Sequence, residues 1–93
     1  MENERLRIGM TVVHFKNPKN KYVIMYIGNM MDCSNGDTTR KVVIYQPLYK
    51  ASKDGNPLMF IRDYDDFMSE VDKEKYPDVK QQYRFEPYID CRI

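Results

Sequence analysis

Two runs of strand-forming residues on either side of an Asn-Gly pair place the strongest constraint on how this 93-residue chain folds. The first run, Tyr22–Met31, opens with Y-V-I-M-Y-I, and the second, Arg40–Gln46, contains K-V-V-I-Y. β-Branched and aromatic residues favour strands, and Asn35-Gly36 supplies the two positive φ angles of a type I′ hairpin turn. The sequence therefore predicts an antiparallel hairpin in which the two runs pair.

Further strands are predicted on both sides of this hairpin. Met10–Phe15 (M-T-V-V-H-F) has strand composition and stops at the turn formers Asn17–Asn20. Pro47 cannot donate to a strand ladder, so it ends the second arm of the hairpin at a sheet edge or bend. Leu58–Arg62 is predicted as a fourth strand, and the polar–aromatic alternation of Tyr83–Ile89 predicts a fifth.

One short helix is expected between the last two strands. Asp63 is predicted as its N-cap, with Asp66 in the third helical position. Behind them an apolar stripe at helical spacing is formed by Tyr64, Phe67, Met68 and Val71. We expect the helix to end near Lys75, before a proline, and Lys50–Pro57 to form an exposed loop.

Five short strands and one short helix predict a mainly β fold, a small SH3-like barrel of about five antiparallel strands. At this length we expect a single domain over residues 1–93, with a core over about 9–89 and a charged arm over 1–7 that frays. Apolar residues make up 42% of the chain and charged residues 31%, which is typical of a soluble globular domain.

Several features predict a protein of the cytoplasm. The chain carries only two cysteines, Cys33 and Cys91, whereas a small secreted domain usually has several bridges. The polar opening residues resemble no signal peptide, and no apolar stretch is long enough to span a bilayer. A membrane partner is therefore not expected.

Six short motifs follow one another through most of the chain. They are G-M-T-V-V-H-F-K (9–16), Y-V (22–23), V-V-I-Y-Q-P-L-Y (42–49), F-I-R (60–62), F-M-S-E-V (67–71) and R-F (84–85). The ordered set resembles a bacterial family, domain of unknown function 1653, and covers about residues 9–86. This resemblance implies a small SH3-like β-barrel. It implies no particular reaction, since no activity is established for the family.

The resemblance also marks individual residues. His14 and Lys16 match the histidine and lysine of the family's first motif, with Phe15 in place of a tyrosine. Arg62 matches the arginine that follows a tryptophan in the fourth motif. The central motif is matched by Tyr45, Leu48 and Tyr49. Of these, Leu48 and Tyr49 are the residues most expected to serve the core alone.

The chain departs from the family pattern at three places. Phe60 replaces the tryptophan, and Asp63 replaces a proline. The family's polar turn, similar to His-Ser-Glu-Thr, is here the unlike stretch M-M-D-C-S-N-G-D-T-T over residues 30–39. If that turn lines a site in the family, the resemblance implies that this chain has changed it.

Motifs for catalysis, metals and cofactors are missing from the sequence. No serine stands in a nucleophile elbow, and the cysteines and the single histidine lack zinc-ligand spacing. The four glycines are isolated, so no phosphate loop is formed. We therefore expect no catalytic residue, metal or cofactor. The alternative is a small enzyme in which His14 acts as acid or base and Arg62 clamps an anion, which requires a pocket joining the two.

The richest feature is aromatic: eight tyrosines and four phenylalanines without a tryptophan. Tyrosines on the two central strands, together with nearby cations, can stack a planar group and pair with phosphate. The tyrosines of those strands are Tyr22, Tyr26, Tyr45 and Tyr49, and the cations are Lys16, Lys21, Arg40, Lys41 and Arg62. The alternative is that these tyrosines only cap a thin core. The candidate ligand-binding residues are His14, Lys16, Tyr22, Tyr45, Gln46 and Arg62.

The favoured functional hypothesis is a non-catalytic binding module for a small ligand, a peptide or a nucleic-acid fragment. A net charge of +1 excludes the strongly basic class of non-specific nucleic-acid binders. Besides the enzyme, a second alternative is a structural homo-oligomer that pairs through an edge strand, because short strands and Pro47 leave sheet edges open.

Overall fold

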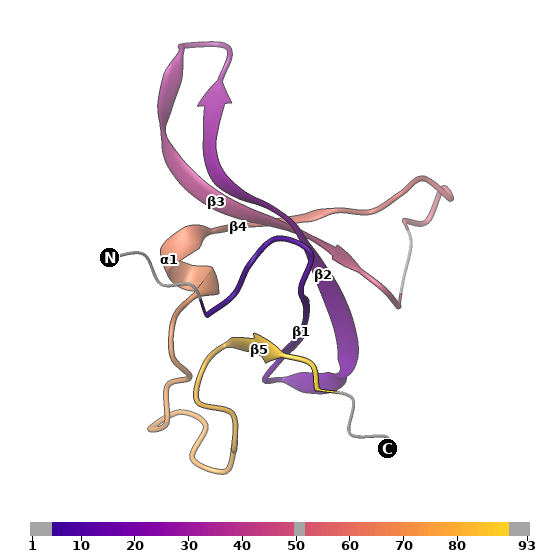
Figure 1. Cartoon of the computed structure of the whole chain (residues 1–93), viewed down its shortest axis with the longest axis vertical. Coiled ribbons are helices and arrows are strands. Elements are labelled where there is room, and N and C mark those ends of the chain that lie inside the picture. The colour runs from indigo at the N-terminus through magenta and orange to yellow at the C-terminus, as the bar shows by residue number, and fades with distance from the viewer. Residues whose placement is uncertain (1–4, 50–51, 90–93) are drawn as a thin grey trace.

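A computed structural model describes residues 5–49 and 52–89. It is mainly β, with a five-stranded antiparallel sheet and one short helix (Figure 1). The elements are β1 (Thr11–His14), β2 (Asn17–Asp32), β3 (Asp37–Pro47), β4 (Phe60–Asp63), α1 (Tyr64–Phe67) and β5 (Phe85–Pro87). The strand order is β4-β3-β2-β1-β5. None of the helices in the described ranges is long and apolar enough to cross a membrane.

The predicted central hairpin is confirmed, and its turn type is wrong. β2 and β3 pair antiparallel with Met30 opposite Arg40. The backbone N–H groups of Asn35 and Gly36 both donate to the carbonyl oxygen of Asp32, at 3.1 and 2.6 Å. Of the Asn35-Gly36 pair, Gly36 has a positive φ and Asn35 does not. The loop is therefore longer than a two-residue type I′ turn, which requires positive φ at both central residues.

β2 is longer than predicted and is shared between two parts of the sheet. It begins at Asn17, so the predicted turn Asn17–Asn20 is wrong. The chain reverses earlier, between His14 and Asn17, which pair with each other, and the register shifts by a bulge between Val13 and His14. The first half of β2 pairs with β1, and its later part continues with β3 into a projecting hairpin (Figure 1). Across the described residues β4 and β5 do not pair with each other, so the sheet is not closed into a barrel.

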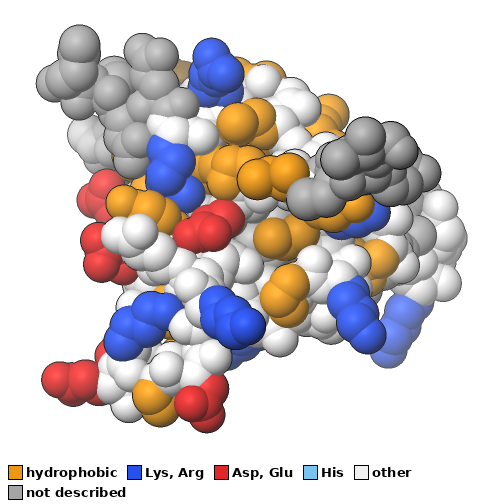
Figure 2. Space-filling model, turned by 60° about the horizontal axis from the view of Figure 1, so that its bottom comes forward, with side chains coloured by type: hydrophobic (Ala, Val, Ile, Leu, Met, Phe, Trp, Pro, Cys, Tyr) orange, Lys and Arg blue, Asp and Glu red, His pale blue; other side chains and the backbone are white. Residues whose placement is uncertain are grey.

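The core lies between the sheet and α1 and is strongly aromatic. Phe67 of α1 stacks on Phe85 of β5 with 4.0 Å between ring centroids and 8° between planes. Around this pair the buried cluster includes Leu6, Val12, Tyr22, Ile24, Val43 and Tyr45. From the side of β1 and β5, hydrophobic side chains occupy the middle of the surface, with charged side chains around them (Figure 2). A domain of this size buries only part of its apolar surface.

The N-terminal arm is part of the packed domain from residue 5 onward, contrary to the prediction of fraying. Leu6 is 2% exposed and belongs to the core cluster. The guanidinium of Arg5 donates to the carbonyl oxygen of Phe85 at 2.7 Å and lies 3.8 Å over the ring of Tyr83. Because the segment is highly charged, the burial of Leu6 in the core was not predicted from the sequence. Residues 1–4 of the arm lie outside the described residues.

The predicted helix exists but ends at Phe67, well before Lys75. Its apolar stripe does face the core, since Phe67 and Val71 are buried. Asp63 is the N-cap residue, as predicted, but its side chain makes no capping hydrogen bond; its carboxylate accepts one from Nε of Arg40 at 2.8 Å instead. After α1 the chain turns so that Glu70 forms a bridge with Tyr83, which stops further helix.

Candidate functional site

Arg62 is fixed by two hydrogen bonds that come from different elements. Its Nε donates to the hydroxyl of Tyr45 at 3.0 Å, and its Nη1 donates to the carboxylate of Asp66 at 2.7 Å. Burial disfavours its charge, but these two hydrogen bonds outweigh that and raise the pKa of Arg62. The two hydrogen bonds hold the guanidinium in one orientation. Because the side chain stays 33% exposed, the guanidinium still reaches solvent.

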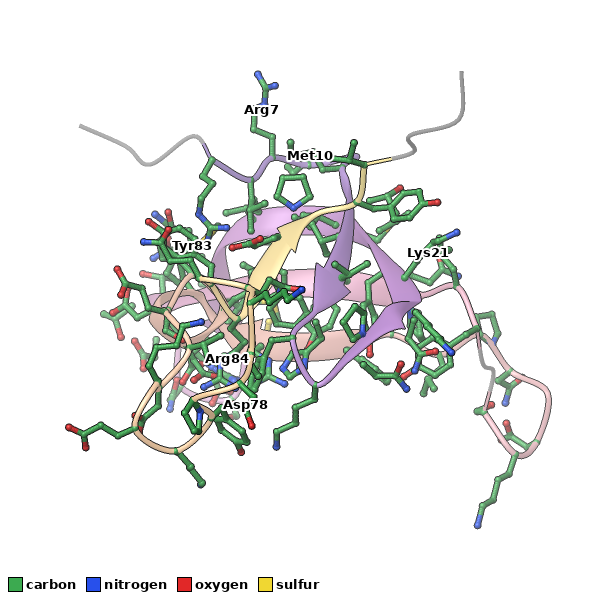
Figure 3. The ribbon with its side chains drawn as sticks, turned by 90° about the horizontal axis from the view of Figure 1, so that it is seen from below. Arg7, Met10, Lys21, Asp78, Tyr83 and Arg84 are labelled. Carbon is green, nitrogen blue, oxygen red and sulfur yellow. The ribbon has the colours of Figure 1, made fainter. Side chains whose placement is uncertain are left out.

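Arg84 approaches the same carboxylate from the segment that leads into β5. Its Nε donates to the hydroxyl of Ser69 at 3.2 Å, and its Nη2 lies 3.6 Å from Asp66. Backbone hydrogen bonds join Arg84 to Ser69 and to Phe15, which ties this segment to the chain just after α1 and just after β1. The side chain is 27% exposed. In the view from below, Arg84 lies on the side of Asp78, away from Arg7 and Met10 (Figure 3).

His14, the last residue of β1, lies near Arg62 and Arg84. Its half-buried ring lies 4.7 Å from the ring of Phe15 and 4.9 Å, edge-on, from that of Phe85. The guanidinium of Arg62 lies 5.6 Å from the same Phe85 ring, so His14 and Arg62 share one aromatic neighbour. Nδ1 of His14 accepts a hydrogen bond from the backbone N–H of Lys16 at 3.1 Å.

The charge state of His14 follows from these neighbours. Burial lowers its pKa from 6.5 to about 4, and the positive charges of Arg62, Arg84 and Lys16 act in the same direction. The ring is therefore neutral at pH 7. Because Nδ1 accepts a hydrogen bond, the ring proton is on Nε2, and that atom is a donor.

We call this group the arginine site and define it by His14, Tyr45, Arg62, Asp66, Ser69 and Arg84. A single carboxylate, Asp66, serves two guanidinium groups, and its hydrogen bond from Arg62 holds its pKa below the usual range, with Arg84 adding to the effect. With neutral His14, the site carries a net positive charge. Alongside the exposed carboxylate of Asp66, the partly exposed guanidinium groups of Arg62 and Arg84 present the hydrogen-bond donors that bind carboxylates and phosphates.

The remaining predicted site residues, Lys16, Tyr22 and Gln46, lie outside the arginine site. Tyr22 packs edge-on against Tyr45 at 5.4 Å between centroids, and its hydroxyl is 3.1 Å from that of Tyr49. Burial and this hydrogen bond raise the pKa of Tyr22. Lys16 is exposed at the turn after β1. Gln46 follows Tyr45 in β3, so its side chain points to the opposite face of the sheet.

Two other expectations about the central strands are wrong. Tyr26 does not join an aromatic platform with Tyr22: its hydroxyl donates to the carbonyl of Asn29 at 2.8 Å, and its ring lies over Gly28. Leu48 and Tyr49, expected to be purely core residues, are 54% and 44% exposed. They follow Pro47, where β3 ends and the chain leaves the sheet.

Three members of the arginine site were missed from the sequence. Asp66 has the pattern of a helix-terminus residue, Ser69 lies in the predicted helix, and Arg84 stood in a strand motif without a role. The available signal was the closing R-F motif, whose arginine lies beside Phe85 in the core. No sequence pattern indicated that one aspartate would link two arginines 22 positions apart in the chain.

The arrangement does not suit acid–base catalysis by His14. A general base needs an accessible lone pair, and here the lone pair of Nδ1 is used by the backbone of Lys16. A pKa of about 4 also makes the ring a weak base at pH 7. Among the described residues no group of metal-ligating side chains is present, and Cys91 lies outside them.

A family model described as protein of unknown function (DUF1653) matches residues 10–87, most of the chain. The chain belongs to the DUF1653 family. The resemblance read from the motifs is thereby confirmed. No curated protein and no solved structure matches the chain significantly. Polar residues from separate DUF1653-like motifs, His14, Tyr45, Arg62 and Arg84, meet in the arginine site although they are distant in sequence.

Proposed function

We propose that this DUF1653 protein is a non-catalytic binding module for a small anionic ligand and that the arginine site holds the anion. The observation that carries this proposal is that Arg62 and Arg84 converge on Asp66 beside neutral His14 while remaining partly exposed. Arg62 uses two of its five N–H donors on protein groups within the described residues. The remaining donors are available to a carboxylate or a phosphate.

The site is organised before any ligand arrives. Tyr45 and Ser69 fix the Nε ends of the two guanidinium groups, so little side-chain freedom is lost when an anion binds. Asp66 keeps the like charges of Arg62 and Arg84 together. An anion entering between these cations gains charge-assisted hydrogen bonds from groups that are already oriented.

The fold that carries the site is proposed to be SH3-like. Three features support this: the order β4-β3-β2-β1-β5, the long β2 shared between both parts of the sheet, and a short helix before the last strand. The arginine site then lies where β4, α1 and the segment before β5 come together. We do not propose edge pairing between copies, because β4 and β5 are only four and three residues long and short edge strands resist pairing.

The proposal is tested by calorimetric titration of inorganic phosphate into wild-type protein and matched variants at constant ionic strength. Arg84→Gln removes one cation of the site. Arg40→Gln removes an arginine that is also paired with an aspartate, Asp63, but lies outside the site. We expect saturable binding that weakens at least about tenfold in Arg84→Gln, since charged hydrogen bonds are worth about 1.5–3 kcal/mol.

The Arg40→Gln control distinguishes a specific anion site from a general effect of positive charge. Arg40→Gln is expected to bind phosphate like the wild type. Equal weakening in both variants would show a diffuse charge effect, and non-saturable binding by the wild type would show that there is no anion site. Either result would contradict the proposal. Because Arg84→Gln changes a partly buried contact, its folding is checked by the dispersion of its NMR spectrum.

A further inference from the structure

A pocket of about 250 Å³ adjoins the arginine site and shares Arg84 with it. It lies between the turn after β1 and the loop that follows α1. Its lining residues are Phe15, Lys16, Glu70, Val71, Asp72, Lys75, Tyr76 and Arg84. We call it the Tyr76 pocket. Arg84 belongs both to this pocket and to the arginine site, so the two are neighbours.

The ring of Tyr76 is flanked by two lysines. Nζ of Lys16 lies 5.8 Å from the ring centroid, and Nζ of Lys75 lies 5.7 Å from it. The ring itself is anchored edge-on against Phe15 at 4.9 Å between centroids. The pocket therefore brings together three cations from three separate segments, Arg84 being the third.

The acidic residues of the pocket do not cancel this arrangement. The carboxylate of Asp72 accepts hydrogen bonds from the backbone N–H groups of Glu74 and Lys75, at 3.0 and 3.3 Å, so it is engaged in closing the loop. Glu70 is exposed to solvent, as Lys16 and Lys75 are, so the three cations and two carboxylates of the lining leave it net positive. The lining thus contains three cations, one engaged carboxylate and one exposed carboxylate.

We propose that the ligand of this protein carries two adjacent anionic groups, as a diphosphate does: the first in the arginine site and the second in the Tyr76 pocket, with Arg84 between them. This inference rests on the proposed function, because it assumes that the arginine site binds the first group. It assigns Lys16 and Lys75 to the second group. An anion with a single charged group would contact Arg62 and Arg84 and leave Lys16 and Lys75 unused.

The test compares inorganic phosphate with inorganic pyrophosphate by calorimetry, in metal-free buffer at matched ionic strength. The variant is Lys75→Gln, and the control is Lys53→Gln, an exposed lysine in the loop between β3 and β4. We expect pyrophosphate to bind wild type at least about tenfold more tightly than phosphate. Lys75→Gln should remove most of that advantage and leave phosphate affinity unchanged, whereas Lys53→Gln should alter neither.

The possible failures are distinguishable. If phosphate binds through Arg84 but pyrophosphate gains nothing, or keeps its full advantage in Lys75→Gln, the second position is refuted and the proposed function stands. If Lys53→Gln weakens pyrophosphate as much as Lys75→Gln does, the advantage reflects overall charge, and the inference is again overturned. If neither anion binds, the proposed function and the inference both fail.

Discussion

Tyr45 and Arg62 join the core of this protein to its candidate site, because a tyrosine that is 3% exposed accepts a hydrogen bond from the partly exposed guanidinium at 3.0 Å. The ring of Tyr45 packs on Phe67 and Phe85, so its hydroxyl position is set by the aromatic core. Packing in the core therefore determines where the donors of Arg62 point.

Tyr45→Phe removes only the hydroxyl and keeps the ring in the core. We expect a loss of about 1.5 kcal/mol in the free energy of unfolding, the lower end for a hydrogen bond to a charged group, because the guanidinium is partly exposed. Phosphate affinity should fall several-fold, because Arg62 loses the partner that orients it. Tyr49→Phe is the matched control, since its hydroxyl pairs with Tyr22 and not with an arginine. Urea unfolding and phosphate titration measure both effects, and an unchanged affinity in Tyr45→Phe would contradict the role of the hydroxyl.

Asp66 should make stability depend on pH in the acid range. Its folded pKa lies below the ordinary 3.8, chiefly through the hydrogen bond from Arg62. The unfolded state therefore binds the proton first, so the stabilisation is complete above the unfolded pKa and is lost as pH falls through the folded one. Wild type should be more stable than Asp66→Asn at pH 7, and the difference should shrink below pH 3.8.

The control for this prediction is Asp65→Asn, which changes the neighbouring carboxylate. Asp65 is exposed and makes no hydrogen bond or ion pair among the described residues. Its removal should cost much less stability at pH 7 than the removal of the Asp66 carboxylate. A gap for Asp66→Asn that stays constant between pH 7 and pH 2 would contradict the assigned ion pair.

The pKa of His14 reports on its burial and on the charges around it. Its folded pKa of about 4 lies below the ordinary 6.5. The imidazole therefore stays neutral while the unfolded state takes up a proton. Its contribution to stability is complete above pH 6.5 and declines as pH falls toward 4. NMR titration of the ring protons should show this low pKa, and saturating phosphate should raise it because a bound anion favours the imidazolium. A pKa of 6.5 that is insensitive to phosphate would refute the assignment.

Gly28 is predicted to be a packing requirement of Tyr26. A Cβ at position 28 would lie 2.6 Å from the hydroxyl oxygen of Tyr26, which is bonded to Asn29. In Gly28→Ala the exposed ring must move and give up that hydrogen bond, at a cost of up to about 1 kcal/mol. In a Tyr26→Ala background the same substitution should cost nothing. Thermal unfolding of the four proteins decides this, and equal costs in both backgrounds would contradict the account.

The sequence predicted the strands well because their signals are local. The hairpin of β2 and β3 was recognisable from β-branched and aromatic runs on both sides of Asn35-Gly36. The helix was overextended because the apolar stripe continues to Val71, which reaches the core from non-helical backbone. Tertiary contact, here the bridge between Glu70 and Tyr83, decided where the helix ended.

The candidate site was only half predictable, for a related reason. Tyr45 and Arg62 were identified because aromatic and cationic residues on neighbouring strands suggest a ligand surface. Asp66 and Arg84 meet through the folding of the segment between α1 and β5, which has no periodic signal. Gln46 was included as a polar residue on the same predicted strands, but neighbours in a strand face opposite sides, so its side chain points away from that of Tyr45.

The most direct test of the anion site is NMR observation of the arginine Nε–Hε groups during titration with inorganic phosphate at constant ionic strength. We expect the signals of Arg62 and Arg84 to shift together and saturate with one affinity, while that of Arg40 stays in place. No saturable shift at Arg62 and Arg84, or an equal shift at Arg40, would contradict the assignment of the arginine site.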